Sequence, residues 1–216
     1  MAQSRAAQGK RYIKSKKKSK KKSKKGLIIF IVISLVLTIG VVGVVIAFNS
    51  GMFKTKQYPQ KYGEYVEKAS NEYNLSTSFI YAVIRTESKF NSDAQSGVGA
   101  CGLMQITPDT FETYMNIRGE SGKYTTNDLF DPAINIDYGC YILRDHLDTF
   151  ENEECALAAY NAGPGNVTAW LEDPNISPDG KTLIVDNIPQ SFAETRNYII
   201  KVEEAEDIYK DLYEDK

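Results

Sequence analysis

The sequence contains few of the residues that most metal and nucleophilic sites need. It has one histidine, His146, and three cysteines, Cys101, Cys140 and Cys155, which are too few ligands for a typical Cys/His zinc site. His146 lies in a polar stretch that is typical of a solvated helix face, and a Ser/His/Asp or Cys/His mechanism would have no other histidine to use. We therefore expect no cofactor and no metal.

A disulfide is also not favoured. Cys140 and Cys155 lie in two predicted helices on either side of a turn near residues 150–152, and they stand at unequal distances from that turn, so pairing is awkward. Because the number of cysteines is odd, at least one thiol is free or pairs between molecules. Burial as a small hydrophobic side chain is the commonest fate of such a residue.

Acidic residues are absent from the first 25 positions, which hold twelve of the 26 Lys and Arg residues. Residues 26–216 therefore carry 14 basic against 28 acidic side chains, a net charge of −14. Such a domain has no basic surface to neutralise phosphates, so we expect no nucleic-acid binding by the folded part. The basic tail is typical of a disordered topology determinant that touches anionic lipid.

Charged residues are absent from residues 27–48, where Ile, Val and Leu dominate. A helix of this length, at about 1.5 Å per residue, crosses a hydrocarbon core of about 30 Å. This predicts a single-pass anchor over residues 26–48 that contacts the membrane through residues 27–48, and the positive-inside bias places a tail of residues 1–25 in the cytoplasm. The alternative is a cleaved signal peptide with Val45 and Ala47 as a poor cleavage pair, but the apolar stretch exceeds the usual length of about 7 to 15 residues.

Beyond the anchor, helix signals are frequent and strand signals are scarce. Residues 49–58 are typical of a short linker, and residues 59–216 are enough for one folded domain with one core. Ser76, Thr107-Pro108 and Asp131-Pro132 are helix-start signals. We expect a mainly α fold with a small β or irregular element. The expected helices cover residues 65–73, 77–88, a segment from 108, 132–150, 153–162 and 188–213, and the best strand candidate is 182–185.

Glu87 is the first candidate for chemistry. In helical register Ile80, Val83, Ile84 and Glu87 fall on one face, so the carboxyl group prolongs an apolar stripe. Burial and the negative end of the helix dipole both push such a carboxyl group toward its protonated form. A protonated carboxyl group at neutral pH is what a general acid requires.

Two later segments are suited to holding a sugar. Residues 97–102 contain three glycines, which let the backbone fold closely and approach a ligand. Tyr160 and Asn161 precede Gly163-Pro164-Gly165, which stops a helix. An aromatic ring and an amide at the end of an element are suited to stacking on a sugar face and bonding its acetamido group.

Together these motifs resemble the soluble lytic transglycosylase (SLT) domain, which is related to goose-type lysozyme. The resemblance spans roughly residues 65–202 and implies a lysozyme-like helical fold. The motifs that carry it occur in the family's order: Glu87-Ser88, Gly97-Val-Gly-Ala-Cys-Gly-Leu-Met-Gln105, Ala159-Tyr-Asn-Ala-Gly-Pro-Gly-Asn166, and Ile188-Pro189 followed by Glu194-Thr-Arg-Asn-Tyr198.

The resemblance implies a bacterial enzyme that cuts the β-1,4 bond between N-acetylmuramic acid and N-acetylglucosamine, with peptidoglycan glycan strands as its substrate. It makes Glu87 the catalytic acid and base. The substrate-binding residues that it implies are Ser88, which orients the reacting sugar, Met104 and Gln105 in the groove, Tyr160 and Asn161 beside the scissile bond, and Tyr198 close to the acid. Core packing is the alternative for Met104 and Tyr198.

This chain departs from the family pattern at two places. Cys101 occupies a variable position of the glycine-rich motif, which casts little doubt on activity. The insert between Trp170 and Ile188 is long, so one wall of the groove cannot be predicted.

Three functions stay open at this point. Ordinary glycosidases use two carboxylates, and the obvious second groups near Glu87 are Asp93 and Asp109. If neither serves, Glu87 acts first as acid and then as base, and the C6 hydroxyl of the muramic acid closes on C1 to give a 1,6-anhydro sugar. If one of them serves, the chain is a goose-type muramidase. The third reading is a cell-wall-binding module without activity.

Overall fold

The computed structural model of the chain describes residues 24–49 and 51–214. The chain forms two compact units, Met1–Asn49 and Ser50–Lys216. The described part of the first unit is a single helix, α1 (Lys24–Asn49). All of the expected basic tail except its last two residues lies outside the described residues.

Helix α1 has the composition of a membrane span. Its stretch Lys25–Ile46 is 22 residues long, has a mean hydropathy of 3.1, and is the one helix of the described residues that is long and apolar enough to cross a membrane. The side chains of this stretch are exposed along its whole length. This agrees in length and position with the predicted anchor.

The second unit is built from helices. They are α2 (Gly51–Gln57), α3 (Gly63–Tyr73), α4 (Thr77–Ser88), α5 (Pro108–Ile117), α6 (Pro132–Phe150), α7 (Glu153–Ala162), α8 (Pro164–Leu171) and α9 (Ala193–Tyr209), with four shorter segments, η1 (Thr126–Phe130), η2 (Val185–Asn187), η3 (Gln190–Phe192) and the π-helical η4 (Lys210–Glu214). Among the described residues, extended pairing is limited to isolated bridges that join Cys101 to Gln95 and to Ile106. The mainly α fold with a small β element is confirmed.

The helices begin where the sequence signals place them. The Ser76 hydroxyl accepts a hydrogen bond from the Phe79 backbone N–H at 3.1 Å, and the Asp131 carboxylate accepts one from Ala133 at 2.8 Å. Thr107 caps α5 in the same way. These side chains satisfy backbone donors that the first turn of a helix leaves without partners. The segment 182–185, in contrast, forms no strand.

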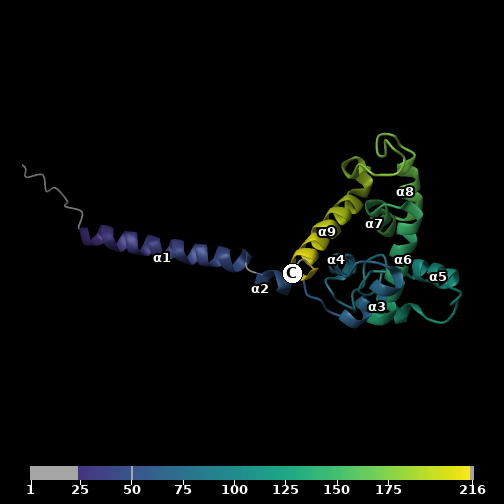
Figure 1. Ribbon diagram of the computed structural model, residues 1–216, viewed down its shortest axis with the longest axis horizontal. Helices are drawn as coiled ribbons and strands as arrows, with labels where there is room; N and C mark the ends of the chain where they lie inside the picture. The colour runs from purple at the N-terminus through teal and green to yellow at the C-terminus, as the bar shows by residue number, and fades with distance from the viewer. Residues whose placement is uncertain (1–23, 50, 215–216) are drawn as a thin grey trace, which may run out of the picture. The chain divides into compact units, whose positions relative to one another are not determined.

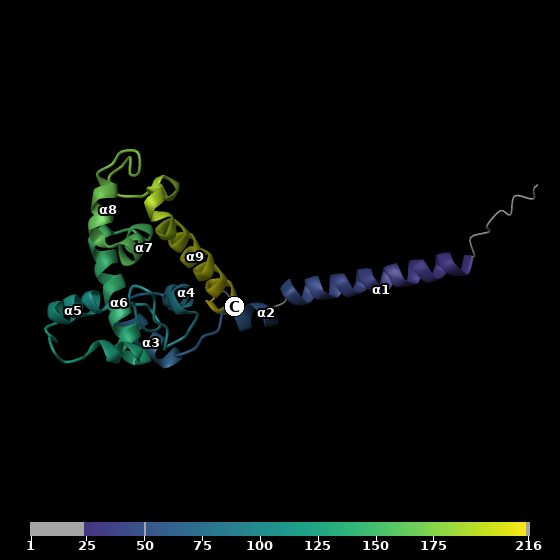
Figure 2. The ribbon, with the colours of Figure 1, turned by 180° about the vertical axis from the view of Figure 1, so that it is seen from behind.

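Figures 1 and 2 show α9 along one side of the unit and α6 with α8 along the other, joined at the top by residues 172–192; α7 lies between them, and α3, α4 and α5 lie below. The core sits where these helices meet. Ile80 and Ile84 of α4 are fully buried, as are Ile199 and Val202 of α9, which packs against α4. The three cysteines are free and buried, as expected.

The segment expected as a linker is attached to this unit. Helix α2 contacts η4, and the Arg85 guanidinium lies over the Tyr58 ring at 3.9 Å. The Tyr213 hydroxyl donates a hydrogen bond to the Tyr58 carbonyl at 2.8 Å, and the Tyr209 hydroxyl donates one to Pro59 at 3.1 Å. Residues just before position 59 therefore pack with the domain instead of standing apart from it.

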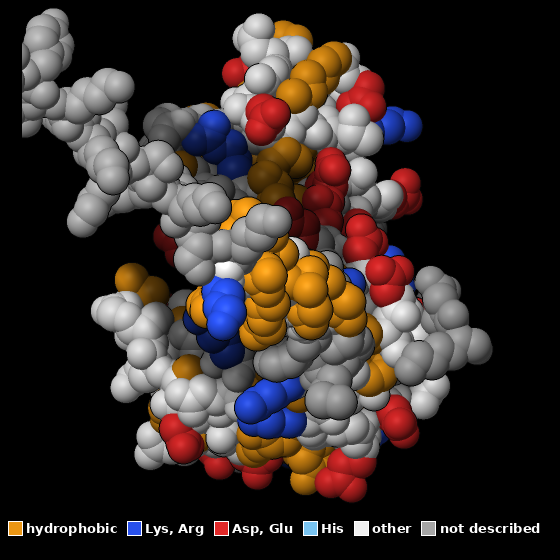
Figure 3. Space-filling view, turned by 90° about the vertical axis from the view of Figure 1, so that its left-hand side faces the viewer, with side chains coloured by type: hydrophobic (Ala, Val, Ile, Leu, Met, Phe, Trp, Pro, Cys, Tyr) orange, Lys and Arg blue, Asp and Glu red, His pale blue; other side chains and the backbone are white. Residues whose placement is uncertain are grey.

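Acidic residues outnumber basic ones in this unit. Figure 3 shows red acidic side chains spread over the upper and lower parts of one face, with few blue basic ones among them. This agrees with the 28 acidic against 14 basic residues of positions 26–216.

Candidate active site

Glu87 lies in the last turn of α4, which ends at Ser88. The chain then turns sharply, since Lys89 and Phe90 adopt left-handed backbone angles of φ 53° and 65°. The residues one and two turns before Glu87 on the same face are fully buried. The apolar stripe read from the sequence therefore leads directly to the carboxyl group.

Burial raises the pKa of Glu87 to about 8. The Tyr198 hydroxyl faces the carboxyl group and lowers this pKa, whereas the negative charge of Glu194 raises it further. The Tyr198 oxygen is itself buried and makes no hydrogen bond of ordinary length and angle with the described residues, so its opposing effect is small beside that of burial. Burial therefore favours the protonated form of Glu87 at neutral pH.

The glycine-rich loop after α4 is fixed by one buried amide. Asn135 of α6 is fully buried; its amide nitrogen donates to the carbonyls of Cys101 at 3.0 Å and Leu129 at 2.8 Å, and its amide oxygen accepts from the Met104 N–H at 2.7 Å. Gly102 passes so close to this amide, at φ 77°, that a Cβ atom would collide with Asn135 and with the Leu129 carbonyl. The loop requires glycine at this position.

Gln105 closes the same loop. Its backbone is left-handed, with φ 49°, and its side-chain nitrogen donates to the carbonyls of Ala94 at 3.1 Å and Gly102 at 2.9 Å. The backbone of Cys101 pairs with that of Ile106 in both directions. The side chain of Gln105 is thereby held at the edge of the loop, where it lines both cavities described below.

The end of α7 supplies the opposite wall. The Tyr160 hydroxyl donates a hydrogen bond to the Met104 carbonyl at 2.8 Å and so ties α7 to the loop. The Asn161 amide oxygen accepts a hydrogen bond from the Thr195 hydroxyl of α9 at 2.7 Å, which leaves the amide nitrogen to face away from Thr195. Gly163 then ends the helix at φ 91°, a backbone angle that favours glycine.

These elements enclose a cavity of about 920 Å³, which we call the acid cavity. Its lining contains five of the seven site residues predicted from the sequence: Glu87, Gln105, Tyr160, Asn161 and Tyr198. It also contains groups that the sequence analysis missed, namely Thr86, Glu194, Thr195 and Lys201. Glu194 and Thr195 belong to the motif that ends at Tyr198, so their presence in that motif was the signal that could have identified them.

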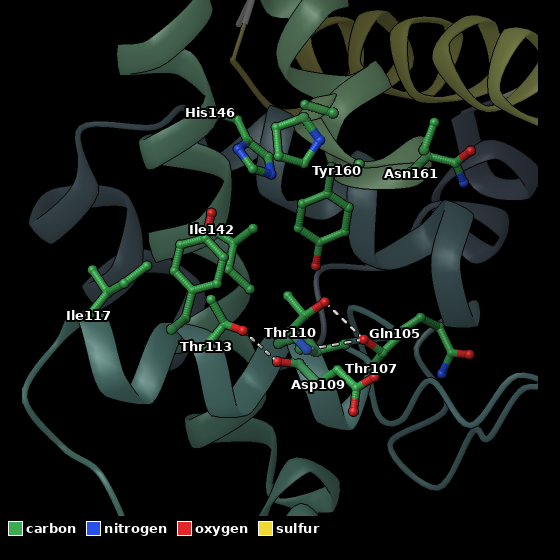
Figure 4. Close-up of a pocket in the computed structure, with 16 residues that line it drawn as sticks. Gln105, Thr107, Asp109, Thr110, Thr113, Ile117, Ile142, His146, Tyr160 and Asn161 are labelled. Atoms are coloured by element: carbon green, nitrogen blue, oxygen red, sulfur yellow. Dashed lines mark hydrogen bonds between the residues drawn. The ribbon is translucent and has the colours of Figure 1, made fainter. Parts of the chain in front are cut away.

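A second cavity of about 500 Å³, the side cavity, opens beside the first. The two share five lining residues, Gln105, Thr107, Tyr160, Asn161 and Ala162. Figure 4 shows Tyr160 and Asn161 on the α7 side of the side cavity, Ile142 and His146 on the α6 side, and Thr107, Thr110 and Thr113 below them. The shared wall makes the two cavities neighbouring parts of one groove.

Ser88 and Met104 do not belong to the lining residues of either cavity. The Ser88 hydroxyl donates to the Ile84 carbonyl one turn back, at 3.2 Å. Met104 is fully buried, and its side chain packs so closely against Gly139 that a Cβ atom there would collide with the sulfur. This position corresponds to the core-packing alternative for Met104, while its carbonyl positions Tyr160.

The two carboxylates weighed as partners of Glu87 lie elsewhere. Asp109 lines the side cavity, in the first turn of α5, and Asp93 is not a lining residue of either cavity. Among the described residues that line the acid cavity, the carboxyl groups are Glu87 and Glu194. No cluster of three or more His, Cys, Asp or Glu side chains that could hold a metal ion occurs within residues 24–49 and 51–214.

Comparison with known proteins decides the family. Residues 64–182, which are 119 of the 216 residues, match the Transglycosylase SLT domain. The chain belongs to this family. The resemblance inferred from the four motifs is confirmed.

Curated SLT relatives are longer than this chain. Membrane-bound lytic murein transglycosylase C of Actinobacillus succinogenes is 33% identical over 171 residues, which are 70% of this chain and 47% of the relative. Soluble lytic murein transglycosylase of Escherichia coli is 33% identical over 162 residues, which are 74% of this chain and 25% of the relative. The chain thus spans between a quarter and a half of their length.

Solved structures show the same architecture. The 70 kDa soluble lytic transglycosylase of Escherichia coli aligns with a TM-score of 0.68 at 32% identity over 76% of this chain and 26% of that one. An inactive mutant of the lytic transglycosylase Slt of Pseudomonas aeruginosa aligns with a TM-score of 0.64 at 35% identity, over 73% of this chain and 25% of that one. A complex of the 70 kDa soluble lytic transglycosylase with bulgecin A aligns with a TM-score of 0.68 at 31% identity, over 76% of this chain and 26% of that one.

Proposed function

We propose that this SLT protein is a peptidoglycan lytic transglycosylase that cleaves the bond between N-acetylmuramic acid and N-acetylglucosamine and forms a 1,6-anhydro-muramic acid end. The observation that carries the proposal is the position of Glu87 at the end of an apolar helix face and on the wall of the acid cavity, where its pKa is raised to about 8; the loop, α7 and α9 build this cavity around it. The names of the relatives, lytic murein transglycosylases, support the same activity.

In the first step the Glu87 carboxyl group donates its proton to the glycosidic oxygen. The bond between that oxygen and C1 of the muramic acid then breaks, and the electron pair stays with the leaving N-acetylglucosamine hydroxyl. The substrate's own N-acetyl carbonyl stabilises the developing positive charge on C1. The acid works at neutral pH because burial keeps the proton on Glu87 until the leaving oxygen takes it.

In the second step the Glu87 carboxylate takes the proton from the C6 hydroxyl of the same muramic acid. The C6 oxygen closes on C1, which forms the 1,6-anhydro ring and restores the protonated Glu87. No water is consumed, and the intramolecular attack gains from a high effective concentration. One carboxyl group therefore performs both proton transfers.

The surroundings of Glu87 support this single-acid route over hydrolysis. Asp109 and Asp93 do not line the acid cavity, and Glu194 stands as a negative charge that favours the protonated form of Glu87. That charge would also favour a cationic sugar in the transition state. A muramidase that recruits Asp109 would have to act across the shared wall of the two cavities.

The remaining site residues bind substrate in this proposal. Tyr160 offers its ring face and Asn161 its amide nitrogen to the sugar beside the scissile bond, and Gln105 lines the floor. Tyr198 lines the acid cavity beside Glu87, and its buried hydroxyl is a hydrogen-bonding group for the bound sugar. For Ser88 the proposed role is to orient the reacting sugar once its hydroxyl leaves the Ile84 carbonyl.

We further propose that α1 spans the cell membrane once, with the N-terminus in the cytoplasm and the SLT domain outside. The apolar stretch Lys25–Ile46 supports the span, and the twelve basic residues before position 26, without an acidic one, support the orientation. Protease treatment of intact protoplasts tests it, because only an exposed SLT domain would be digested.

Mass analysis of digested peptidoglycan tests the activity. The wild-type chain should release fragments that end in 1,6-anhydro-muramic acid and are one water lighter than hydrolysed ends. Reducing muramic acid ends would refute the transglycosylase and favour the muramidase, and cell-wall gels without clearing would favour a binding module. Glu112→Gln on the exposed face of α5 is the matched control for Glu87→Gln.

A further inference from the structure

The segment that joins α1 to the rest of the chain differs in charge from the SLT domain. Every acidic residue of the chain lies at or after Glu64. We call residues 51–63 the joining segment; it contains no acidic residue and three basic ones, Lys54, Lys56 and Lys61. Residues 64–216 carry 11 basic against 28 acidic side chains, a net charge of −17. The joining segment is therefore a positive region at the edge of a strongly negative domain.

The fold does not use the charges of these three lysines. Each side chain is exposed, and none forms an ion pair with an acidic side chain among residues 24–49 and 51–214. Lys123 and Lys210, in contrast, each pair with a carboxylate, at 2.6 and 2.8 Å. Of the two carboxylates on η4, which α2 contacts, Asp211 is exposed and Glu214 accepts a hydrogen bond from the Ser78 N–H at 3.2 Å. The ammonium groups of the joining segment are thus available to a partner.

The joining segment is fixed to the end of α4 that carries Glu87. The Arg85 Nε donates a hydrogen bond to the Gln57 carbonyl at 3.1 Å, and the Arg85 guanidinium lies over the Tyr58 ring. Arg85 precedes Glu87 by two residues in α4, which is about 3 Å along the helix axis. Whatever holds the end of α2 therefore also holds the last turn of α4.

The chain leaves little distance between the joining segment and a membrane that α1 spans. Ile46, where the apolar stretch ends, is followed by α2 from Gly51, and the residues between them extend over at most about 18 Å. The seven residues of α2 add about 10 Å. Lys54 and Lys56 project from different sides of α2, because residues two apart do not share a helix face. This arrangement suits a short helix that is surrounded by lipid headgroups.

We propose that the lysines of the joining segment bind anionic phospholipid headgroups on the outer surface of the membrane, and that the contact of Arg85 with this segment keeps the acid cavity close to the bilayer. The lipid contact rests on the proposed span and orientation of α1. Each lysine beside an anionic surface strengthens such a contact about fivefold, and salt weakens it. With the proposed activity, the chain then cuts glycan strands near the membrane in preference to strands free in solution.

Amine footprinting of the full-length chain in lipid nanodiscs tests the contact. Acetylation of Lys54 and Lys56, followed by mass spectrometry, should be at least about fivefold slower in discs rich in phosphatidylglycerol than in discs of phosphatidylcholine. High salt should abolish this difference. Lys181 is exposed and belongs to residues 172–192, which lie at the top of Figure 1, away from α2; its rate should be the same in both discs. Equal rates for Lys54 and Lys56 in the two kinds of disc would overturn the proposal.

Two charge-matched pairs of substitutions test the consequence for cutting. Lys54→Gln with Lys56→Gln removes two charges from the joining segment, and Lys68→Gln with Lys181→Gln removes two exposed charges elsewhere. The measurement is the rate of cleavage of strands tethered to phosphatidylglycerol-rich proteoliposomes, divided by the rate for free strands. This ratio should fall severalfold in the first pair and stay at the wild-type value in the second.

The outcomes separate this proposal from the proposed function. If neither kind of strand is cleaved, the lytic activity fails, and the footprinting result alone decides the lipid contact. If both are cleaved and the ratio is unchanged in Lys54→Gln with Lys56→Gln, or falls equally in both pairs, the activity stands and the positioning of the acid cavity by the joining segment is refuted.

Discussion

The acid cavity and the side cavity share a wall of five residues and differ in what lies beyond it. The acid cavity contains two carboxyl groups and a lysine, Glu87, Glu194 and Lys201, whereas the side cavity contains one exposed carboxylate and a buried neutral histidine. The acid cavity contains the ionisable groups that a proton transfer requires. The side cavity contains mainly apolar and neutral hydrogen-bonding groups.

The wall that the two cavities share is held by two different elements of the fold. Tyr160 and Asn161 belong to both cavities, and each is fixed by a hydrogen bond to a different element, Tyr160 to the loop and Asn161 to α9. A substrate that crosses the shared wall is therefore positioned by one rigid set of groups. Substitutions in the acid cavity should therefore change turnover, and substitutions in the side cavity should change glycan binding. Substitutions that loosen the glycine-rich loop should change both.

The largest effect is expected from Glu87→Gln, which removes the proton donor and keeps the shape of the side chain. Turnover should fall by about 10³-fold or more, because both proton transfers use this group. Glycan binding, measured by calorimetry with a N-acetylglucosamine hexamer, should persist. A variant that retains turnover would remove Glu87 from the mechanism.

Asn135→Ala should damage both cavities at once. It removes three buried hydrogen bonds that hold the loop, so the free energy of unfolding should drop by about 3 kcal/mol. Urea unfolding followed through the single, buried Trp170 measures this loss. Asn71→Ala on the exposed face of α3 is the control, with a change within about 0.5 kcal/mol.

The pH dependence of stability should reveal the buried acid. The pKa of Glu87 is raised from 4.5 to about 8 in the folded state, so the folded state keeps this proton to a higher pH than the unfolded state. The free energy of unfolding therefore falls as the pH rises from about 4.5 to about 8. Glu87→Gln lacks this loss. It should be more stable than the wild type by up to about 5 kcal/mol at pH 9 and equal to it at pH 4, in the same urea experiment.

Thr195→Val tests the shared wall. The variant removes the hydroxyl that fixes the Asn161 amide and keeps the buried volume. We expect kcat/KM to fall about tenfold, since an unsatisfied and misdirected amide costs about 1 to 1.5 kcal/mol. Thr168→Val, on the exposed side of α8, should leave kcat/KM unchanged, and equal losses in both variants would argue against a positioning role for Thr195.

Glu194→Gln should give the smallest effect. Its charge is a secondary cause of the raised Glu87 pKa, so the alkaline limb of the kcat/KM profile should move to lower pH by less than about one unit. A shift to higher pH would contradict the assigned electrostatics.

The sequence predicted the frame of this domain well and its site in part. Caps and proline signals placed the starts of α4, α5 and α6 because these signals act within one turn. Helical periodicity placed Glu87 on the same face as the buried Ile80 and Ile84. In contrast, α8 was missed, because a Gly-Pro-Gly sequence reads as a helix stop, whereas here Pro164 also opens the next helix.

The remaining differences depend on contacts distant in sequence. Met104 lies in the core because Gly139, on α6, leaves space for it, and His146 lines a cavity because α5 and α7 close over α6. Neither relation is visible in local patterning. Likewise, the ordering of residues near 58 depends on Arg85 and Tyr213, which the composition of a short polar segment does not reveal.

The most direct measurement is the titration of Glu87 itself. Carboxyl signals of the ¹³C-glutamate-labelled wild type, compared with those of Glu87→Gln, identify the group and follow its protonation with pH. We predict a pKa of about 8 for Glu87. A carboxyl group that ionises between about pH 4 and 5, like an exposed glutamate, would contradict the account.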